Sequence, residues 1–218
     1  MVNQNSKPWY KKTWVIVVGV FLLLILIGNF AGGSKQTSNV NSTNLENVKV
    51  DSSKIFTTKD SMDLVKTKSN FSYKNDEFQK VGWYTHKLEN TSNRNTLMAK
   101  VNSTGYIYLE DQFYGEDWIF HTHVEVKIGD NIYKSDDVKG SDNERENSGG
   151  DVWETITYSN GKDNGILQAI AENSDKQIKV RFVGDQHISD FILSTSDKNI
   201  IRDSYNLSNL IKKSKKIS

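Results

Sequence analysis

The pattern of apolar and polar residues divides the chain into three parts. An almost unbroken apolar run covers residues 14–31, a polar stretch rich in Gly, Ser, Asn and Thr covers 32–54, and short alternating apolar runs fill 55–218. As a helix, its part from Trp14 to Phe30 spans about 25 Å, close to the roughly 30 Å hydrocarbon core of a bilayer. The pattern therefore predicts a transmembrane helix over 14–31, a flexible linker over 32–54 and a folded domain over 55–218.

Flanking residues predict the orientation of this anchor, which Trp14 and Phe30 delimit. The basic segment 1–13 precedes the apolar run, and only one lysine, Lys35, follows it closely. The positive-inside rule then places the N-terminus in the cytoplasm and the domain outside the cell membrane. A cleaved signal peptide has the same order of segments, but bulky Phe30 before Ala31 fits a small-residue cleavage site poorly. We expect an uncleaved single-pass anchor in the bilayer.

Short apolar runs separated by turn residues predict a β-rich domain after the linker. The expected strands are 81–88, 97–101, 106–109, 117–128, 132–133, 153–158, 177–184 and 188–194. Helical spacing predicts a helix over 166–173 and a final helix capped by Ser194 or Ser196, whereas 55–70 fits either a helix or a strand. The fold class expected is α+β, an antiparallel β-rich domain with one or two C-terminal helices. An immunoglobulin-like β-sandwich is the alternative.

The sequence HTHVEV carries the most specific candidate chemistry. His121, His123 and Glu125 alternate, so a regular strand would place all three on one face, opposite Val124 and Val126. Two imidazoles and a carboxylate suit Zn²⁺ or non-haem iron with open coordination positions. The same alternation is also typical of an ordinary solvent-exposed strand face, which is the interpretation we favour. The metal site remains the alternative.

Two acidic groups suggest other chemistry. The segment 139–151 is predicted to be a polar loop, and the acids in and around it would suit Ca²⁺, although their spacing differs from that of an EF-hand; they are Asp136, Asp137, Asp142, Glu144, Glu146 and Asp151. The pairs Glu110–Asp111 and Glu116–Asp117 lie near aromatic residues, as an acid/base pair for glycans would. Neighbours on a strand face opposite ways, so each pair is expected to flank a turn.

Composition narrows the possible functions further. The chain has no cysteine, which excludes disulfides, thiol catalysis and thiolate zinc sites, and its net charge of +1 gives no field that favours nucleic acid. No hydrolase elbow, Walker loop, dinucleotide glycine motif or HExxH sequence is present. The basic segment KKSKK at 212–216 would contact anionic lipid or wall polymer.

Four stretches together resemble uncharacterised exported or membrane-anchored bacterial proteins that carry a β-rich domain of unknown function. They are DEFQKVGWYTHK (76–87), YGEDWIF (114–120), ENSGGDVWE (146–154) and RFVGDQHISDFILSTSDKNII (181–201). The resemblance implies export and a compact β-rich domain, and it supplies no catalytic residues.

These observations together predict a single-pass, membrane-anchored, extracytoplasmic protein. Its expected role is that of a non-catalytic binding or interaction module, with a protein or an envelope polymer as ligand, no cofactor and no nucleic acid. The alternative is an envelope metal-binding protein or metalloenzyme that uses the His-x-His-x-Glu face.

Overall fold

The computed structural model describes residues 55–139 and 143–216. The predicted anchor (14–31) and linker (32–54) lie outside the described residues. Within the described ranges, no helix is both long enough and apolar enough to cross a membrane. The described residues belong to the domain that was predicted to begin at residue 55.

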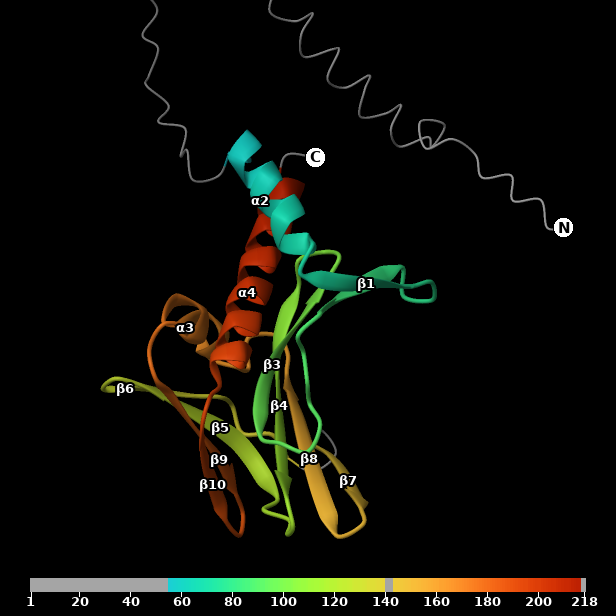
Figure 1. Cartoon of the computed structure of the whole chain (residues 1–218). Helices are drawn as coiled ribbons and strands as arrows, with labels where there is room; N and C mark the ends of the chain where they lie inside the picture. Colours follow the sequence, from blue (N-terminus) through green and yellow to red (C-terminus); the bar gives the residue numbers. More distant parts are fainter. Residues whose placement is uncertain (1–54, 140–142, 217–218) are drawn as a thin grey trace, which may run out of the picture. The chain divides into compact units, whose positions relative to one another are not determined.

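Two antiparallel sheets form most of the domain (Figure 1). The larger sheet has six strands in the order β1-β2-β3-β4-β8-β7, and the smaller has four in the order β10-β9-β5-β6. The larger sheet comprises β1 (Phe71–Asp76), β2 (Val81–His86), β3 (Thr96–Asn102), β4 (Ile107–Gly115), β7 (Asn143–Ser148) and β8 (Asp151–Tyr158). The smaller sheet comprises β5 (His121–Ile128), β6 (Asn131–Lys134), β9 (Ile178–Gly184) and β10 (Ile188–Ile192).

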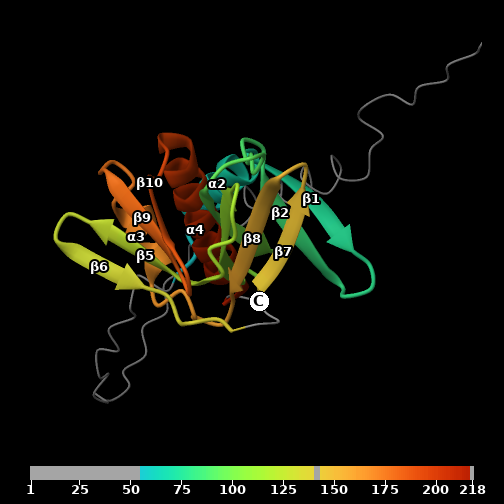
Figure 2. The ribbon, with the colours of Figure 1, turned by 90° about the horizontal axis from the view of Figure 1, so that it is seen from below.

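Three helices complete the described part: α2 (Thr58–Lys68), α3 (Ile166–Glu172) and α4 (Thr195–Lys215). Helix α4 begins where Ser194 accepts a hydrogen bond from the N–H of Asp197, which confirms Ser194 as the cap rather than Ser196. It packs along β3 and against α3. Seen from below, the two sheets lie on opposite sides of α4 (Figure 2).

The main core lies between the inner faces of the two sheets and extends to α3 and α4. Its wholly buried members include Leu109, Ile156, Val126, Phe182 and Ile170, one from each of five elements. A second, smaller cluster joins α4 to β1 and β3 through Leu207, Ile211, Phe71 and Val101. Because α3 and α4 contribute buried residues to these clusters, the α+β class is confirmed over the β-sandwich alternative.

Most predicted elements are present, with two corrections in the larger sheet. The segment 139–151, predicted to be a loop, contains β7, which pairs with β8 from Asn143↔Ile156 to Ser148↔Asp151. All six residues of this strand are polar and only the first is buried, so it lacks the apolar alternation of a half-buried strand. Strand β1 is exposed at four of its six positions and was not predicted for the same reason.

The segment 55–70, left open between helix and strand, forms α2. Thr57 and Asp60 make a capping box, in which each side chain accepts the backbone N–H of the other residue, at 3.2 and 2.7 Å. The apolar residues of this helix divide between two environments: Leu64 packs against the smaller cluster, whereas Met62 and Val65 face solvent.

Candidate functional site

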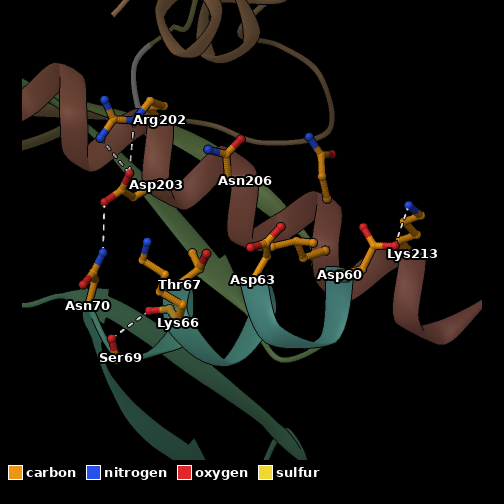
Figure 3. Close-up of a pocket in the computed structure, with 12 residues that line it drawn as sticks. Asp60, Asp63, Lys66, Thr67, Ser69, Asn70, Arg202, Asp203, Asn206 and Lys213 are labelled. Carbon is orange, nitrogen blue, oxygen red and sulfur yellow. Dashed lines mark hydrogen bonds and ion pairs between the residues drawn. The ribbon is translucent and has the colours of Figure 1, made fainter. Parts of the chain in front are cut away.

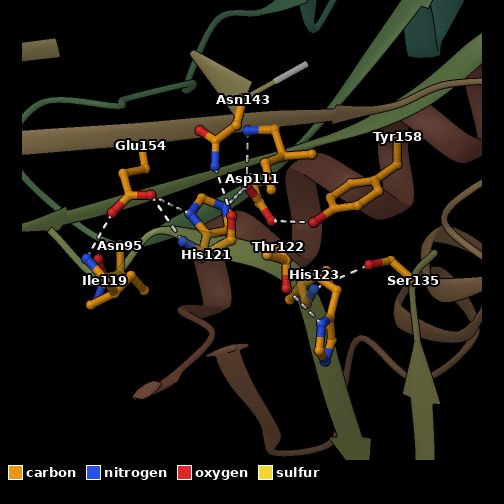
Figure 4. A network of polar contacts seen from close by, with 12 residues as sticks. Asn95, Asp111, Ile119, His121, Thr122, His123, Ser135, Asn143, Glu154 and Tyr158 are labelled. Carbon is orange, nitrogen blue, oxygen red and sulfur yellow. Dashed lines mark hydrogen bonds and ion pairs between the residues drawn. The ribbon is translucent and has the colours of Figure 1, made fainter. Parts of the chain in front are cut away.

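A cluster of charged side chains lies in the core between β4, β5 and β8 (Figure 4). The side chains of Asp111, His121 and Glu154 have no exposed surface. His121 Nε2 lies 2.9 Å from Asp111 Oδ1, and its Nδ1 lies 3.5 Å from Glu154 Oε2. Asp111 also accepts hydrogen bonds from the Tyr158 hydroxyl at 3.0 Å and from the N–H of Ile156 at 3.1 Å. One imidazole therefore sits between two carboxylates.

A β-bulge explains why His121 points into the core. His121 pairs with Gly184 and His123 pairs with Val183, so β5 contains one residue more than β9 at this point. The extra residue reverses the alternation, and His121 shares the buried side with Val124 and Val126. The prediction that His121 lies on a solvent-exposed face with His123 and Glu125 is therefore wrong.

Glu154 anchors the chain just before the bulge. Its carboxylate accepts the backbone N–H groups of Ile119, Phe120 and His121 at 2.8, 2.8 and 2.9 Å. Phe120 adopts the left-handed conformation, with φ of 53°, which turns these three N–H groups toward one acceptor. Strand β5 consequently begins at His121 rather than at residue 117 as predicted.

The charges of this cluster stabilise one another. Burial lowers the pKa of His121, but Asp111 and Glu154 outweigh burial and raise it to about 9. Burial raises the pKa of Glu154, but His121 and the N–H groups of Phe120 and Ile119 lower it to about 2. An imidazolium and an ionised Glu154 therefore coexist at neutral pH. Because the groups have no exposed surface, they are out of reach of a substrate, and we assign them a structural role.

His123 lies on the opposite side of β5 and is also buried, with 7% of its surface exposed. Its Nδ1 is 2.9 Å from Asp137 and its Nε2 is 3.8 Å from Glu125. Burial and Lys134 lower the pKa of His123 despite these carboxylates. The three metal candidates are therefore divided between two faces, with His123 and Glu125 on one and His121 on the other. Over residues 55–139 and 143–216, no group of three or more His, Asp or Glu side chains could hold a metal ion.

The acidic residues proposed for Ca²⁺ are likewise spread over separate elements. Glu144 and Glu146 are exposed on β7, and Asp151 begins β8. Asp136 and Asp137 follow β6, where Asp137 pairs with His123 and with Lys134. Asp142 lies outside the described residues.

The pair Glu110–Asp111, predicted to flank a turn, lies in the middle of β4. Strand alternation sends Asp111 into the core and Glu110 to the outer face of the larger sheet. The same alternation on β8 buries Glu154 and turns Trp153 and Thr155 outward. The buried charges thus lie directly beneath the outer face. Glu116 and Asp117 do lie at a bend, after the end of β4.

This outer face contains a hollow of about 400 Å³ between β4, β7, β8 and the loop after β2. Trp153 lines it and packs against Tyr114, with ring centroids 5.5 Å apart. Glu144 and Glu146 lie across from Thr155 and Trp153 in the strand register, and both are exposed. The hollow combines a half-exposed indole face with carboxylates and hydroxyls, groups that bind sugars or cationic ligands.

A second, larger hollow of about 730 Å³ lies between α2 and α4 (Figure 3). Its lining is almost entirely polar. Lys213 donates to Asp60 of α2 at 2.8 Å, and Asn70, just after the end of α2, donates to Asp203 of α4 at 3.2 Å, so a pair of side chains lies at each end of the groove. These pairs fix α2 on the domain.

Sequence reasoning missed Glu154, Tyr158 and Asn143 as members of the buried cluster. Asn143 donates to the carbonyl of His121 at 2.7 Å across a separation of 22 residues. The sequence did contain one indication of this cluster: Glu154 lies between Val152 and Ile156 in the alternating pattern of β8, at a position that faces the core. That position requires a buried partner, which the sequence does not identify.

Comparisons with protein-family models, with curated proteins and with solved structures found no match to this chain. The resemblance to exported bacterial proteins, based on the four stretches between 76 and 201, accordingly stays a prediction.

Proposed function

We propose that the chain is a single-pass membrane protein that displays residues 55–218 outside the cell membrane as a non-catalytic binding module. In this proposal residues 14–31 span the bilayer, residues 1–13 remain in the cytoplasm, and 32–54 serve as the linker. The apolar run and its preceding lysines support the anchor and its orientation.

The proposed binding role rests on the difference between the buried charged groups and the open outer face. The strongly interacting acid and base groups, Asp111, His121 and Glu154, are wholly enclosed, so they lack the solvent access that catalysis needs. The outer face above them is open, with Trp153, Glu144 and Glu146 around a hollow. Rigid support beneath an accessible aromatic and polar surface suits recognition of a ligand. The ligand class we propose is an envelope polymer that presents sugar rings or amino groups.

Accessibility in protoplasts tests the orientation. The full chain carries one tag at each end, and external protease is added to intact protoplasts. We expect digestion of the C-terminal tag and protection of the N-terminal tag. The reverse pattern would contradict the proposal, and digestion only after lysis would place the domain inside the cell.

Sedimentation with purified peptidoglycan tests the binding surface. We expect the full chain in detergent to be retained, and Trp153→Ala to lower this retention severalfold, because the stacking surface is removed. Tyr73→Ala is the matched control, since Tyr73 is an exposed aromatic residue on β1, away from the hollow. Equal retention of the two variants would remove the outer face as the binding surface, and no retention of the unaltered chain would remove this ligand class.

Metal analysis tests the alternative function built on His121, His123 and Glu125. Because these residues face opposite sides of β5, we expect zinc or iron content in the purified full chain to be the same with and without His123→Ala. Stoichiometric metal that disappears in the variant would favour the metalloprotein instead.

A further inference from the structure

We propose that the outward face of α2 docks onto the anionic lipid surface of the membrane in which the chain is anchored. This inference rests on the proposed anchor and goes beyond it, because it assigns a lipid-binding surface to the folded domain itself. Three features support it: the residues that α2 exposes, the position of α2 in the chain, and the charges beside it.

Helix α2 exposes apolar side chains that a surface helix would ordinarily bury. Met62 is 63% exposed and Val65 is 71% exposed, and their spacing of three residues places them on one face of the helix. Ile55, just before the helix, is 47% exposed. None of the residues of α2 is fully buried, although Leu64 packs against the smaller core cluster. The helix is thus held to the domain by one side and presents an apolar strip on the other.

The charged residues of α2 differ in exposure. Its three lysines, Lys59, Lys66 and Lys68, are exposed, although Lys66 borders the groove toward α4 and Lys68 lies over the ring of Tyr84. Its two acids, Asp60 and Asp63, are only half-exposed and line that groove (Figure 3). Asp60 is paired with Lys213 at 2.8 Å. An apolar strip bordered by lysines, with the carboxylates turned inward, is the arrangement of helices that lie in the headgroup region of anionic membranes.

More positive charge lies at the same end of the domain. The Lys213–Asp60 pair brings the last turn of α4 beside the first turn of α2. Lys215 and Lys216 follow at the exposed end of α4. These lysines of the basic C-terminal segment would face the same lipid surface as α2, because an anionic leaflet attracts cations near it.

The position of α2 in the chain favours a membrane over another protein as the partner. It is the first element after the predicted linker 32–54, and a Gly- and Ser-rich chain of that length has a root-mean-square span of roughly 25 Å. The anchor therefore keeps α2 at a high effective concentration near the lipid surface, where a small apolar strip and a few lysines are sufficient for docking.

A single fluorescent label tests this proposal in the full chain. The sequence contains no cysteine, so Val65→Cys provides one attachment site for an environment-sensitive dye. Ile132→Cys is the matched control, because Ile132 is 63% exposed on β6 in the smaller sheet. Each labelled chain is reconstituted into nanodiscs of phosphatidylcholine, with or without phosphatidylglycerol, that contain lipids carrying a quencher.

We expect quenching of the label at position 65 to be severalfold stronger in the anionic discs than in the neutral ones, and the label at 132 to respond to neither. The combined change Lys59→Glu, Lys66→Glu and Lys68→Glu is expected to abolish the difference. Equal quenching in both discs, or at both positions, would overturn the proposal. Shielding of position 65 in detergent, without any lipid, would identify a protein contact and would also overturn it.

Recovery of the discs separates this inference from the proposed function. A chain that does not co-purify with the discs lacks the anchor, and both proposals then fail. A chain that co-purifies while its label at 65 remains unquenched retains the anchor and loses only the docking surface. Reversible unfolding of each labelled chain, measured in parallel, verifies that the substitutions leave the fold intact.

Discussion

Two regions of this domain depart from the usual distribution of residues in opposite ways. Between β4, β5 and β8, charged side chains occupy the core: Asp111, His121 and Glu154 have no exposed surface. On α2, Met62 and Val65 expose most of their apolar surface. Burial of an unpaired charge strongly destabilises a fold, whereas exposure of a few apolar side chains costs little free energy. The first departure is therefore compensated inside the fold, whereas we propose that the second is compensated by a lipid surface outside it.

This difference between the two regions predicts where substitutions will be costly. Asp111, His121 and Glu154 are buried in contact with one another, so removal of one leaves a partner without its contact in the core. Met62 and Val65 are mostly exposed, so their truncation leaves no buried group without a partner. Free energies of unfolding in urea measure this difference, and the largest effects are expected in the buried cluster.

The largest effect is expected for Asp111→Ala. This change leaves the His121 imidazolium with one carboxylate and removes the acceptor of the Tyr158 hydroxyl and of the Ile156 N–H. Breaking a buried pair in this way costs about 3–5 kcal/mol. Glu110→Ala, on the outer face of the same strand, is the control and should cost less than about 1 kcal/mol. Similar losses for the two variants would mean that the cluster contributes little to stability.

The pH dependence of stability should follow the two shifted groups. The pKa of His121 is raised to about 9, so its stabilisation is complete below about pH 6.5, its usual value, and is lost as the pH rises through 9. The pKa of Glu154 is lowered to about 2, so its stabilisation is present above about pH 4.5 and is lost as the pH falls toward 2.

Stability is therefore expected to be greatest between about pH 4.5 and 6.5 and to fall by up to about 3 kcal/mol by pH 9. His121→Gln should flatten the alkaline decline, whereas His187→Gln, at an exposed residue, should preserve it. An unchanged alkaline decline in the first variant would show that another group is responsible.

Two arginine–aspartate pairs with hydrogen bonds of equal length lie in different surroundings, and Arg94 donates in addition to the carbonyl of Asn90 at 2.9 and 2.6 Å. Arg94 binds Asp197 and Arg181 binds Asp190, each through two hydrogen bonds of 2.7 Å. The Asp197 side chain is 4% exposed and the Asp190 side chain is 56% exposed. We expect Arg94→Ala to cost about 2 kcal/mol and Arg181→Ala to cost clearly less, because solvent screens the exposed pair. Equal costs would show that neither the burial of Asp197 nor the additional bonds of Arg94 to Asn90 raise the contribution of this pair.

The smallest effect is expected on α2. Met62→Ser and Val65→Ser should each change stability by less than about 0.5 kcal/mol, because both side chains are already exposed. Leu64→Ser is the control in the same helix and should cost at least about 1 kcal/mol, since Leu64 packs against the smaller cluster. A large loss in Met62→Ser would mean that the strip has a partner within the chain.

Part of this architecture was predictable because local patterns report local geometry. The alternation of Ile178, Val180 and Phe182 identified β9, and the spacing of Ile166, Leu167 and Ile170 identified the buried side of α3. Ser194 and Asp197 marked the start of α4. In each case the residues that determine the element lie within a few positions of one another, so a short stretch of sequence is sufficient to predict it.

The candidate site was less predictable because its members come from distant strands. Asp111 meets His121 across a β-bulge, and Glu154 reaches the same imidazole from 33 residues away. One extra residue in β5 was enough to move His121 from the predicted solvent face to the core. A bulge of this kind depends on the pairing partner, Gly184 on β9, and leaves no periodic signal of its own.

The sequence by itself thus determined the α+β class, most strand and helix positions, and the segments that we propose as anchor and linker. Tertiary structure decided which face each polar residue occupies, that β7 pairs as a strand, and that the apolar residues of α2 divide between core and solvent. The physical reason is that backbone conformation responds chiefly to neighbouring residues. Burial and charge pairing depend instead on segments brought together only when the chain folds.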